Sequence, residues 1–231
     1  MREEILADVD AVARRAAEVI ADAAREAVAA RDRFVLATSG GSTPWLMLRH
    51  LADLQVPWAR VELFQADERI APRGHADRNL TSLTQSLLDH LPEPLGGVHA
   101  MPVEVHDSQE AARRYADTVT LVAGNPAVFD MIHLGLGEDG HTASLIPDDP
   151  ILDVDSAEVG VSGVYAGRRR LTLTYPVLNR ARRILWVVTG AAKVPMLDRL
   201  RCGDPTIPAG RVRSVHALLL ADRAASPRTH S

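Results

Sequence analysis

The fold is indicated most clearly by the stretch FDMIHLGLGEDGHTASL at residues 129–145. Residues 129–134 form a short, mostly apolar run of the kind found in buried strands. Glycines at 135, 137 and 140 then interrupt the run, and an apolar stretch resumes after His141. We therefore predict a strand over 129–134 that leads into a glycine-rich loop over 135–145.

The chain on both sides of this stretch alternates between strand and helix patterns. Residues 2–30 carry apolar side chains at helical spacing, which predicts a long amphipathic helix. Further helices are predicted from Pro44 to Leu54, from an Asp77 cap to Leu88, from an Asp107 cap to about Val122 and from Ala191 to Leu200, and further strands at 34–38, 61–64, 170–175, 184–189 and 215–220. This order predicts one α/β domain over 1–231, with a mostly parallel sheet, helices on both faces and a frayed tail at 224–231.

The composition limits the class of protein. Hydrophobic residues make up 46% of the chain and charged residues 24%, which excludes intrinsic disorder, and every apolar run is shorter than the roughly 20 residues of a membrane span. The net charge of −4 disfavours nucleic acid as a partner but permits a small anionic ligand where cations converge. The single cysteine, Cys202, and a start without signal-peptide character predict a cytoplasmic protein without disulfides. Cys202 as a nucleophile is disfavoured, because no histidine lies near it in sequence.

Polar residues follow several of the predicted strands. These positions are 39–44, 66–69, 135–145 and 190–193. Since ligands of open parallel sheets bind beyond the carboxyl ends of the strands, we expect these four segments to form one site.

Two of the segments have the properties of an anion site. Gly40 and Gly41 allow successive backbone N–H groups to point at an anion, Ser42 and Thr43 add hydroxyl donors, and a helix begins directly afterwards. The alternative is a tight turn in which Ser42 or Thr43 caps the helix. Lys193 lies in the first turn of a predicted helix, where its charge opposes the helix dipole, so either a bound anion or simple solvent exposure explains it.

Two basic segments offer further phosphate contacts. In Asp67-Glu68-Arg69, alternation along a strand places Asp67 and Arg69 on one side and Glu68 on the other. A guanidinium presents several donors to a phosphate, although a surface ion pair is the simpler interpretation. The run at 168–170 is either a solvated face or, through Arg170, part of the same phosphate site.

His141 is the candidate general base. An unperturbed histidine has a pKa of about 6.5 and can take a proton from water near neutral pH. Asp139 is close enough in sequence to orient the ring, and backbone N–H groups of the loop could stabilise an oxyanion. A plain connecting turn is the alternative. Neither an H-E-x-x-H nor a G-x-S-x-G pattern occurs, so we expect no metal site and no covalent serine mechanism.

Taken together, five ordered motifs resemble the glucosamine-6-phosphate isomerase/6-phosphogluconolactonase family. They are SGGSTP (39–44), DER (67–69), GLGEDGHTASLIP (135–147), RLTLTYPVLNRARR (170–183) and VTGAAK (188–193). The resemblance implies a Rossmann-like fold, no cofactor, a monomer or small homo-oligomer, and hydrolysis of 6-phospho-D-glucono-1,5-lactone in the oxidative pentose phosphate pathway. It also implies that His141 is the base, that Asp67 lies at the active site, and that Arg69, Arg170, Lys193 and the 39–43 loop face the substrate or its phosphate.

The residues after His141 separate the two activities of this family. In the glucosamine-6-phosphate deaminases that this chain also resembles, the corresponding loop has a sequence like DGHIAFNEP, with a glutamate where this chain has Ile146. The lactonase interpretation is therefore favoured over a deaminase or isomerase, and over a non-catalytic sugar-phosphate sensor, which would usually carry a DNA-binding module. Two departures from the family pattern are Ala66 before Asp67 and the segment 163–169 in place of Lys-Pro-Pro. The second leaves open whether Arg168, Arg169 or Arg170 contacts the phosphate.

Overall fold

The computed structural model describes residues 1–213 and 215–227. Its centre is a seven-stranded sheet in which every neighbouring pair of strands is parallel. The strand order is β1-β10-β9-β6-β2-β3-β5, formed by β1 (Arg2–Leu6), β10 (Ala217–Asp222), β9 (Ile184–Val188), β6 (Met131–Leu134), β2 (Phe34–Thr38), β3 (Val61–Gln65) and β5 (Gly97–His99). The predicted α/β class with a mostly parallel sheet is confirmed.

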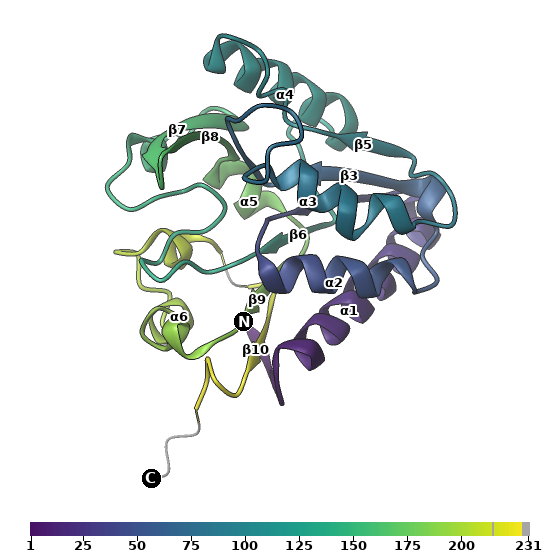
Figure 1. The fold of residues 1–231 in the computed structure, drawn as a ribbon, viewed down its shortest axis with the longest axis vertical. Helices are drawn as coiled ribbons and strands as arrows, with labels where there is room; N and C mark the ends of the chain where they lie inside the picture. Colours follow the sequence, from purple (N-terminus) through teal and green to yellow (C-terminus); the bar gives the residue numbers. More distant parts are fainter. Residues whose placement is uncertain (214, 228–231) are drawn as a thin grey trace.

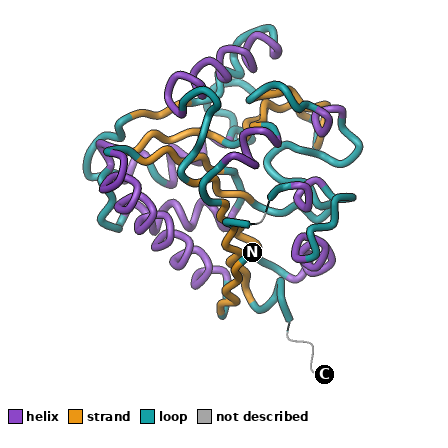
Figure 2. The backbone as a smooth tube through the Cα atoms, turned by 180° about the vertical axis from the view of Figure 1, so that it is seen from behind, coloured by secondary structure: helices purple, strands orange, loops and turns teal. Residues whose placement is uncertain are grey.

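Helices cover both faces of this sheet, as Figures 1 and 2 show from opposite sides. One face packs against α1 (Val9–Arg31), α2 (Ser42–Ala52) and α3 (Asn79–Ser86), and the other against α4 (Ser108–Ala123), α5 (Tyr175–Arg180) and α6 (Val194–Arg201). Along β2, Phe34 and Leu36 are buried in the core under α1, α2 and α3, while Val35 and Ala37 are buried in the core under α4, α5 and α6. Successive strand residues point to opposite faces, so a strand buried on both sides must be apolar throughout.

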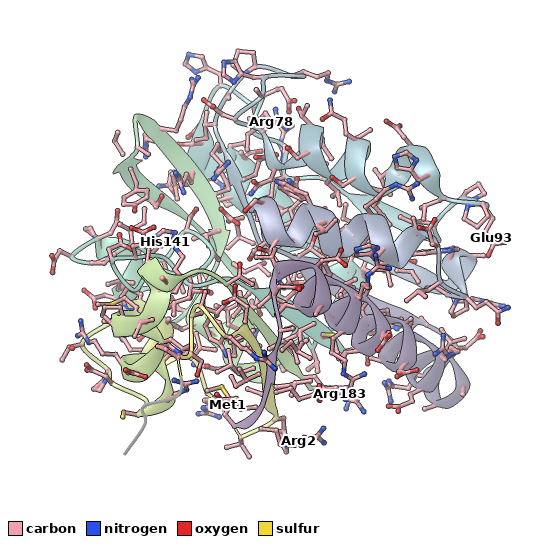
Figure 3. All side chains as sticks on the ribbon, turned by 60° about the horizontal axis from the view of Figure 1, so that its bottom comes forward. Met1, Arg2, Arg78, Glu93, His141 and Arg183 are labelled. Atoms are coloured by element: carbon pink, nitrogen blue, oxygen red, sulfur yellow. The ribbon has the colours of Figure 1, made fainter. Side chains whose placement is uncertain are left out.

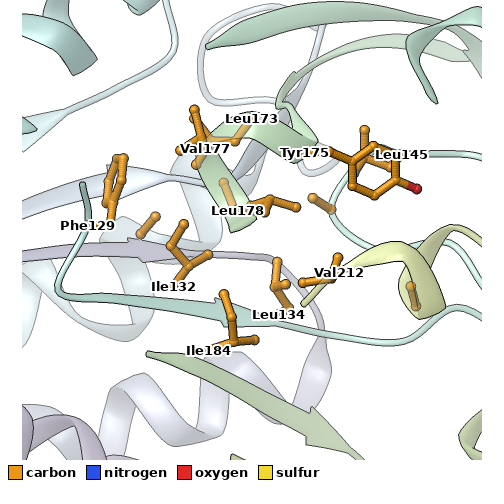
Figure 4. Close-up of a cluster of buried hydrophobic side chains, with 14 of the residues drawn as sticks. Phe129, Ile132, Leu134, Leu145, Leu173, Tyr175, Val177, Leu178, Ile184 and Val212 are labelled. Atoms are coloured by element: carbon orange, nitrogen blue, oxygen red, sulfur yellow. The ribbon is translucent and has the colours of Figure 1, made fainter. Parts of the chain in front are cut away.

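A second, three-stranded antiparallel sheet lies beside the first, in the order β4-β8-β7. It consists of β4 (Asp67–Arg69), β8 (Arg168–Leu173) and β7 (Val159–Tyr165). The predicted strand at 170–175 therefore belongs to this sheet and not to the parallel one, because the two-residue turn 166–167 pairs β8 locally with β7. Figure 4 shows the apolar contact between this part of the chain and the main sheet: Leu173 of β8 and Leu178 of α5 lie over Ile132 and Ile184.

Two further predictions need correction at the chain ends. Residues 2–6 form strand β1, paired in parallel with β10, and the helix begins only after Asp8, whose carboxylate accepts the Ala11 N–H at 2.9 Å. Ile5 fits both a helical and a strand pattern, so periodicity could not separate them. The expected fraying does not reach Ala225, which is fully buried and donates its N–H to Asp222. Residues 228–231 of that predicted tail lie outside the described part of the chain.

Several helix boundaries differ by a few residues from the prediction. Helix α2 begins at Ser42 and not at Pro44, and α6 begins at Val194 after a 3₁₀ turn, whereas Asp107 caps α4 as predicted, accepting the Gln109 N–H at 2.8 Å. The 3₁₀ helices are η1 (Trp58–Arg60), η2 (Leu88–His90), η3 (Pro150–Asp153), η4 (Ala191–Lys193) and η5 (Pro208–Arg211). No helix in the described ranges is both long enough and apolar enough to cross a membrane.

The strand order places a crevice at the centre of the sheet. From β2 the chain proceeds outward to β3 and β5, whereas from β6 it proceeds in the other direction to β9 and β10. The connections after β2 and β6 therefore diverge, and the space beyond the carboxyl ends of these two neighbours stays open. The loops 39–41 and 135–141 border this space.

The N-terminus of helix α3 is capped by a side chain of strand β4. Asp77, the predicted cap, does not fill this role; instead the Glu68 carboxylate accepts the backbone N–H groups of Asn79 and Leu80 at 2.7 and 2.9 Å. Glu68 also forms an ion pair with Arg78, with 3.0 Å between Oε2 and Nε, and both side chains are almost completely buried. Glu68 therefore joins β4 to α3, and removing its charge would leave the Arg78 guanidinium without its buried counterion.

We expect Glu68→Gln to lower the free energy of unfolding by about 3–5 kcal/mol, because breaking a buried ion pair leaves an uncompensated charge. Urea denaturation followed by circular dichroism measures the change. Glu104→Gln is the matched control, since Glu104 contacts the same Arg78 at 2.9 Å but is 40% exposed, and its loss should cost less than about 1 kcal/mol. Equal losses in the two variants would contradict the role assigned to Glu68.

Candidate functional site

A pocket of about 470 Å³ lies in the crevice beyond β2, β6 and β9, with the small sheet as one wall. Figure 3 labels His141, which belongs to the loop after β6 and lies in space between the β7–β8 hairpin and α6. The pocket brings together sequence-predicted residues from five separate segments: Gly40, Gly41, Ser42, Thr43, Asp67, Arg69, His141, Arg170 and Lys193. Asp139 does not line the pocket but lies directly behind the imidazole.

His141 and Asp139 form a hydrogen-bonded pair. The Nδ1 atom of the ring lies 2.6 Å from Oδ1 of Asp139, which also accepts the His141 backbone N–H at 3.1 Å. Partial burial alone would raise the pKa of Asp139, but the two His141 donors and the Tyr165 hydroxyl outweigh it and hold that pKa below its usual value. Asp139 is therefore a carboxylate, which favours the tautomer with the proton on Nδ1 and the lone pair on Nε2.

The loop holds this ring against its own backbone. A Cβ at Gly137 would lie 2.1 Å from Nδ1 of His141, so only glycine allows the ring to sit there. The Gly137 N–H donates to the His141 carbonyl at 2.8 Å, and the Thr142 hydroxyl donates to the Gly135 carbonyl at 2.9 Å. These contacts give the imidazole a defined position.

Two arginines face one another across the small sheet. The β4–β8 register pairs Arg69 with Arg170, and like charges in opposed positions destabilise a sheet. The pKa of Arg170 is lowered, first by burial and then by the charge of Arg69. Within the described residues, the buried Nε atoms of both arginines have no hydrogen-bond partner. An anion in the pocket would supply the acceptors and the charge that this pair lacks.

Asp67 supplies part of that compensation. Burial raises its pKa, while Arg69, the Ser144 hydroxyl and Arg170 act in the opposite direction. Ser144 donates to Oδ2 of Asp67 at 2.8 Å, and the Asn79 side chain donates to the Asp67 carbonyl at 2.9 Å. Asp67 thus lies between the arginine pair and the loop that carries His141.

The loop after β2 presents a helix N-terminus to the pocket. Gly41, at a φ of 136°, is the N-cap of α2, and in the described structure this cap makes no side-chain hydrogen bond. The alternative in which Ser42 or Thr43 caps the helix is therefore wrong; the Thr43 hydroxyl instead pairs with that of Thr189 at 2.7 Å. A Cβ at Gly40 would lie 2.1 Å from Oδ1 of Asn79, so the close approach of this loop to α3 requires glycine.

The remaining cations occupy distinct positions. Lys193 lines the pocket, with Nζ 3.9 Å from Oε1 of the exposed Glu138. Of the three consecutive arginines, Arg170 lines the pocket, whereas Arg169 is exposed and Arg168 forms an ion pair with Asp77 at 3.0 Å. The alternation of side chains along β8 explains why Arg169 points away from its neighbour's pocket.

Sequence reasoning did not single out several residues of the pocket wall, although Glu138 lies in the predicted 135–145 loop and Thr189 in the 188–193 motif: Asn79, Glu138, Tyr165 and Thr189. Asn79 was expected only as an ordinary position within a helix, and its contact with Asp67 depends on how α3 packs on β4. Tyr165 lies in the segment 163–169, where the departure from the family pattern was the one available signal. Among residues 1–213 and 215–227, no group of three or more His, Cys, Asp or Glu side chains is arranged to hold a metal ion.

Comparison with known proteins gives a consistent assignment. The model of the family described as glucosamine-6-phosphate isomerases/6-phosphogluconolactonase matches residues 7–220. A 6-phosphogluconolactonase of Synechocystis sp. is 35% identical over 201 residues, covering 85% of this chain and 83% of the relative.

Two solved structures show that this fold accompanies both activities. The 6-phosphogluconolactonase of Thermotoga maritima superposes with a TM-score of 0.85 at 24% identity, covering 96% of this chain and 98% of the other. A monomeric glucosamine-6-phosphate deaminase superposes with a TM-score of 0.84 at 19% identity, covering 98% and 99%. The fold alone therefore does not separate the two reactions, but it agrees with the sequence match, and the chain belongs to the glucosamine-6-phosphate isomerase/6-phosphogluconolactonase family.

Proposed function

We propose that this protein hydrolyses 6-phospho-D-glucono-1,5-lactone to 6-phospho-D-gluconate, a step of the oxidative pentose phosphate pathway. The observation that carries the proposal is the arrangement within one pocket of an oriented His141–Asp139 pair and the facing arginines Arg69 and Arg170. The first can activate water and the second can hold a phosphate. The similarity to the Synechocystis 6-phosphogluconolactonase supports the same reaction.

The deaminase alternative is not favoured by the residues after His141. Ile146 stands where the resemblance to deaminases would require a glutamate, and it is an apolar side chain only 7% exposed. The hydroxyl of Ser144, in the same segment, donates its hydrogen bond to Asp67. The loop thus offers no carboxylate at position 146 for opening an amino sugar, whereas lactone hydrolysis requires one base and an anion site.

The reaction proceeds by general-base catalysis in this proposal. Nε2 of His141 takes a proton from a water molecule as its oxygen bonds to C1, and the carbonyl electrons move to oxygen to form a tetrahedral oxyanion. Backbone N–H groups or a nearby cation stabilise that charge. When the carbonyl re-forms, the bond from C1 to the ring oxygen breaks, and the imidazolium returns its proton to that oxygen. The carboxylic acid product then loses a proton to solvent.

The phosphate is held at the cationic part of the pocket. Arg69, Arg170 and Lys193 supply positive charge, and the first turn of α2 with the loop at 39–43 supplies backbone and hydroxyl donors. We favour Arg170 over Arg168 and Arg169 for this contact, because Arg170 alone of the three lines the pocket. Burial raises the pKa of Asp67 and the charges of the two arginines oppose that rise, so Asp67 offsets part of their mutual repulsion.

The proposal extends to a cytoplasmic enzyme that acts without a cofactor, as a monomer or small homo-oligomer. Hydrolysis of a lactone transfers neither electrons nor a carried group, so the protein's own side chains suffice for the chemistry. The lone Cys202 is consistent with a reducing compartment. Light scattering on the purified protein measures the oligomeric state.

We expect His141→Asn to lower kcat by about 10²–10⁴-fold with little change in KM, because general-base catalysis contributes to the transition state and not to ground-state binding. The assay uses freshly generated lactone and subtracts spontaneous hydrolysis. His106→Asn, at an exposed histidine outside the pocket, is the control and should retain parental activity. A His141 variant with parental kcat would remove this residue from the mechanism.

We expect Arg69→Gln and Lys193→Gln each to weaken binding of 6-phosphogluconate by about 10-fold or more, because each removes a charge-assisted contact to the phosphate. Calorimetric titration measures the dissociation constants. The matched control is Arg169→Gln, which removes the same charge from an exposed position on β8. If both pocket variants bind 6-phosphogluconate as tightly as the control does, the anion site is wrongly assigned.

A further inference from the structure

We propose that Tyr165 is a positioning residue that holds the His141–Asp139 pair and Arg170 in one arrangement. The inference rests on the lactone hydrolysis proposed above and assigns a function to a side chain that the sequence motifs do not include. Tyr165 contacts the base and one of the cations, and it lines the pocket itself.

The aromatic ring contacts His141 and Arg170 with different geometries. Its centroid lies 5.1 Å from that of the His141 imidazole, with 65° between the ring planes, an edge-on contact that restricts rotation of the imidazole. The Arg170 guanidinium carbon lies 4.9 Å from the Tyr165 centroid, above the ring face. Nη2 of Arg170 also donates to the Tyr165 carbonyl at 3.3 Å. The ring therefore contacts both the base and the cation.

The hydroxyl group acts on Asp139. Burial and the neighbouring Asp139 carboxylate raise the pKa of Tyr165, so the phenol keeps its proton. In turn, Tyr165 contributes to the lowered pKa of Asp139, beside the backbone and ring of His141, which hydrogen-bond to Asp139 at 3.1 and 2.6 Å. A protonated phenol is therefore the neighbour of the carboxylate that orients the imidazole.

The hairpin places Tyr165 in a defined position. The tight turn at 166–167 follows directly, with positive φ at both residues, and a register shift between Ser162 and Tyr165 inserts an extra residue into β7. Such a bulge changes which face the following side chain takes. Asp149 accepts the Gly163 N–H at 2.7 Å and so fixes the bulge from a neighbouring loop.

The tip of the β7–β8 hairpin is also held in place through β8. Arg168, opposite Tyr165, forms an ion pair with Asp77 at 3.0 Å, in the segment that precedes α3. The side chain of Tyr165 is therefore positioned by contacts on both strands of the hairpin and not only by its own packing. A residue held in this way can keep His141 and Arg170 in place as the charge on the imidazole changes during the reaction.

The hydroxyl and the ring make separable contributions. Without the hydroxyl, the Asp139 carboxylate loses a polar neighbour and holds the imidazole less firmly, so kcat falls while the ring keeps its contact with Arg170. Without the ring, Arg170 loses its cation–π contact and binds phosphate less well. Other charged groups share the pocket and remain unchanged in both cases: Asp67, Arg69, Glu138 and Lys193.

The experiment compares Tyr165→Phe and Tyr165→Leu with Val164→Ala, a control on the same strand whose side chain is 72% exposed. Kinetics are measured across pH with fresh lactone, and melting temperatures are recorded alongside. For Tyr165→Phe we expect kcat to fall by about 3-fold to 10-fold at unchanged KM. For Tyr165→Leu we expect KM to rise as well, by about 3-fold to 10-fold. Val164→Ala should behave as the parent.

The outcomes separate this inference from the function on which it rests. A parental protein without lactonase activity contradicts the proposed function. A parental protein that is active, with Tyr165→Phe matching its kcat and its pH profile, contradicts the role of Tyr165 alone. A variant that loses melting temperature while its kinetic constants and pH profile stay parental shows a structural residue and likewise overturns the inference.

Discussion

Strands β2 and β6 pair in parallel at the centre of the sheet, with Leu36 opposite Met131 and Ala37 opposite Ile132. Because both strands end at the same edge, the loop that binds the anion in our proposal and the loop that carries His141 start side by side. The buried His133 strengthens this link: burial lowers its pKa to about 3, so the neutral ring can accept the Ser39 N–H at 3.3 Å. The other segments that line the pocket, from the small sheet and from the chain after β9, lie around these two strand ends.

The small antiparallel sheet adds the charges. Its pairing brings Arg69 and Arg170 into opposed positions, where their repulsion and partial burial carry a cost to stability. Asp67 offsets part of this cost, and Glu68, on the opposite side of the same strand, anchors β4 to α3. The three residues of β4 thus have separate functions: Asp67 and Arg69 face the pocket, while the carboxylate of Glu68 stabilises the fold on the other side. The apolar contact of β8 and α5 with the main sheet keeps this charged layer in place (Figure 4).

The catalytic end of the pocket depends on geometry at short range. Gly137 lets the His141 ring approach the backbone, Asp139 selects its tautomer, and Tyr165 contacts both the ring and Arg170. The base and the anion site are consequently parts of one contact network, linked through the β7–β8 hairpin. This arrangement suits a reaction that needs one oriented imidazole and a firmly held phosphate.

The sequence by itself determined the α/β class, the positions of most buried strands and the loops that meet at the site, because strand burial and glycine-rich strand ends are local properties. It also indicated His141, Asp139 and Arg69, whose side chains fall in recognisable motifs. Only the tertiary structure decided that residues 2–6 form an edge strand, that β8 pairs with β7 and β4, and that Glu68 caps α3. Likewise, it alone separated Arg170 from Arg168 and brought Tyr165 to the imidazole. These features depend on which distant segments pack together, and the spacing of residues along one chain does not contain that information.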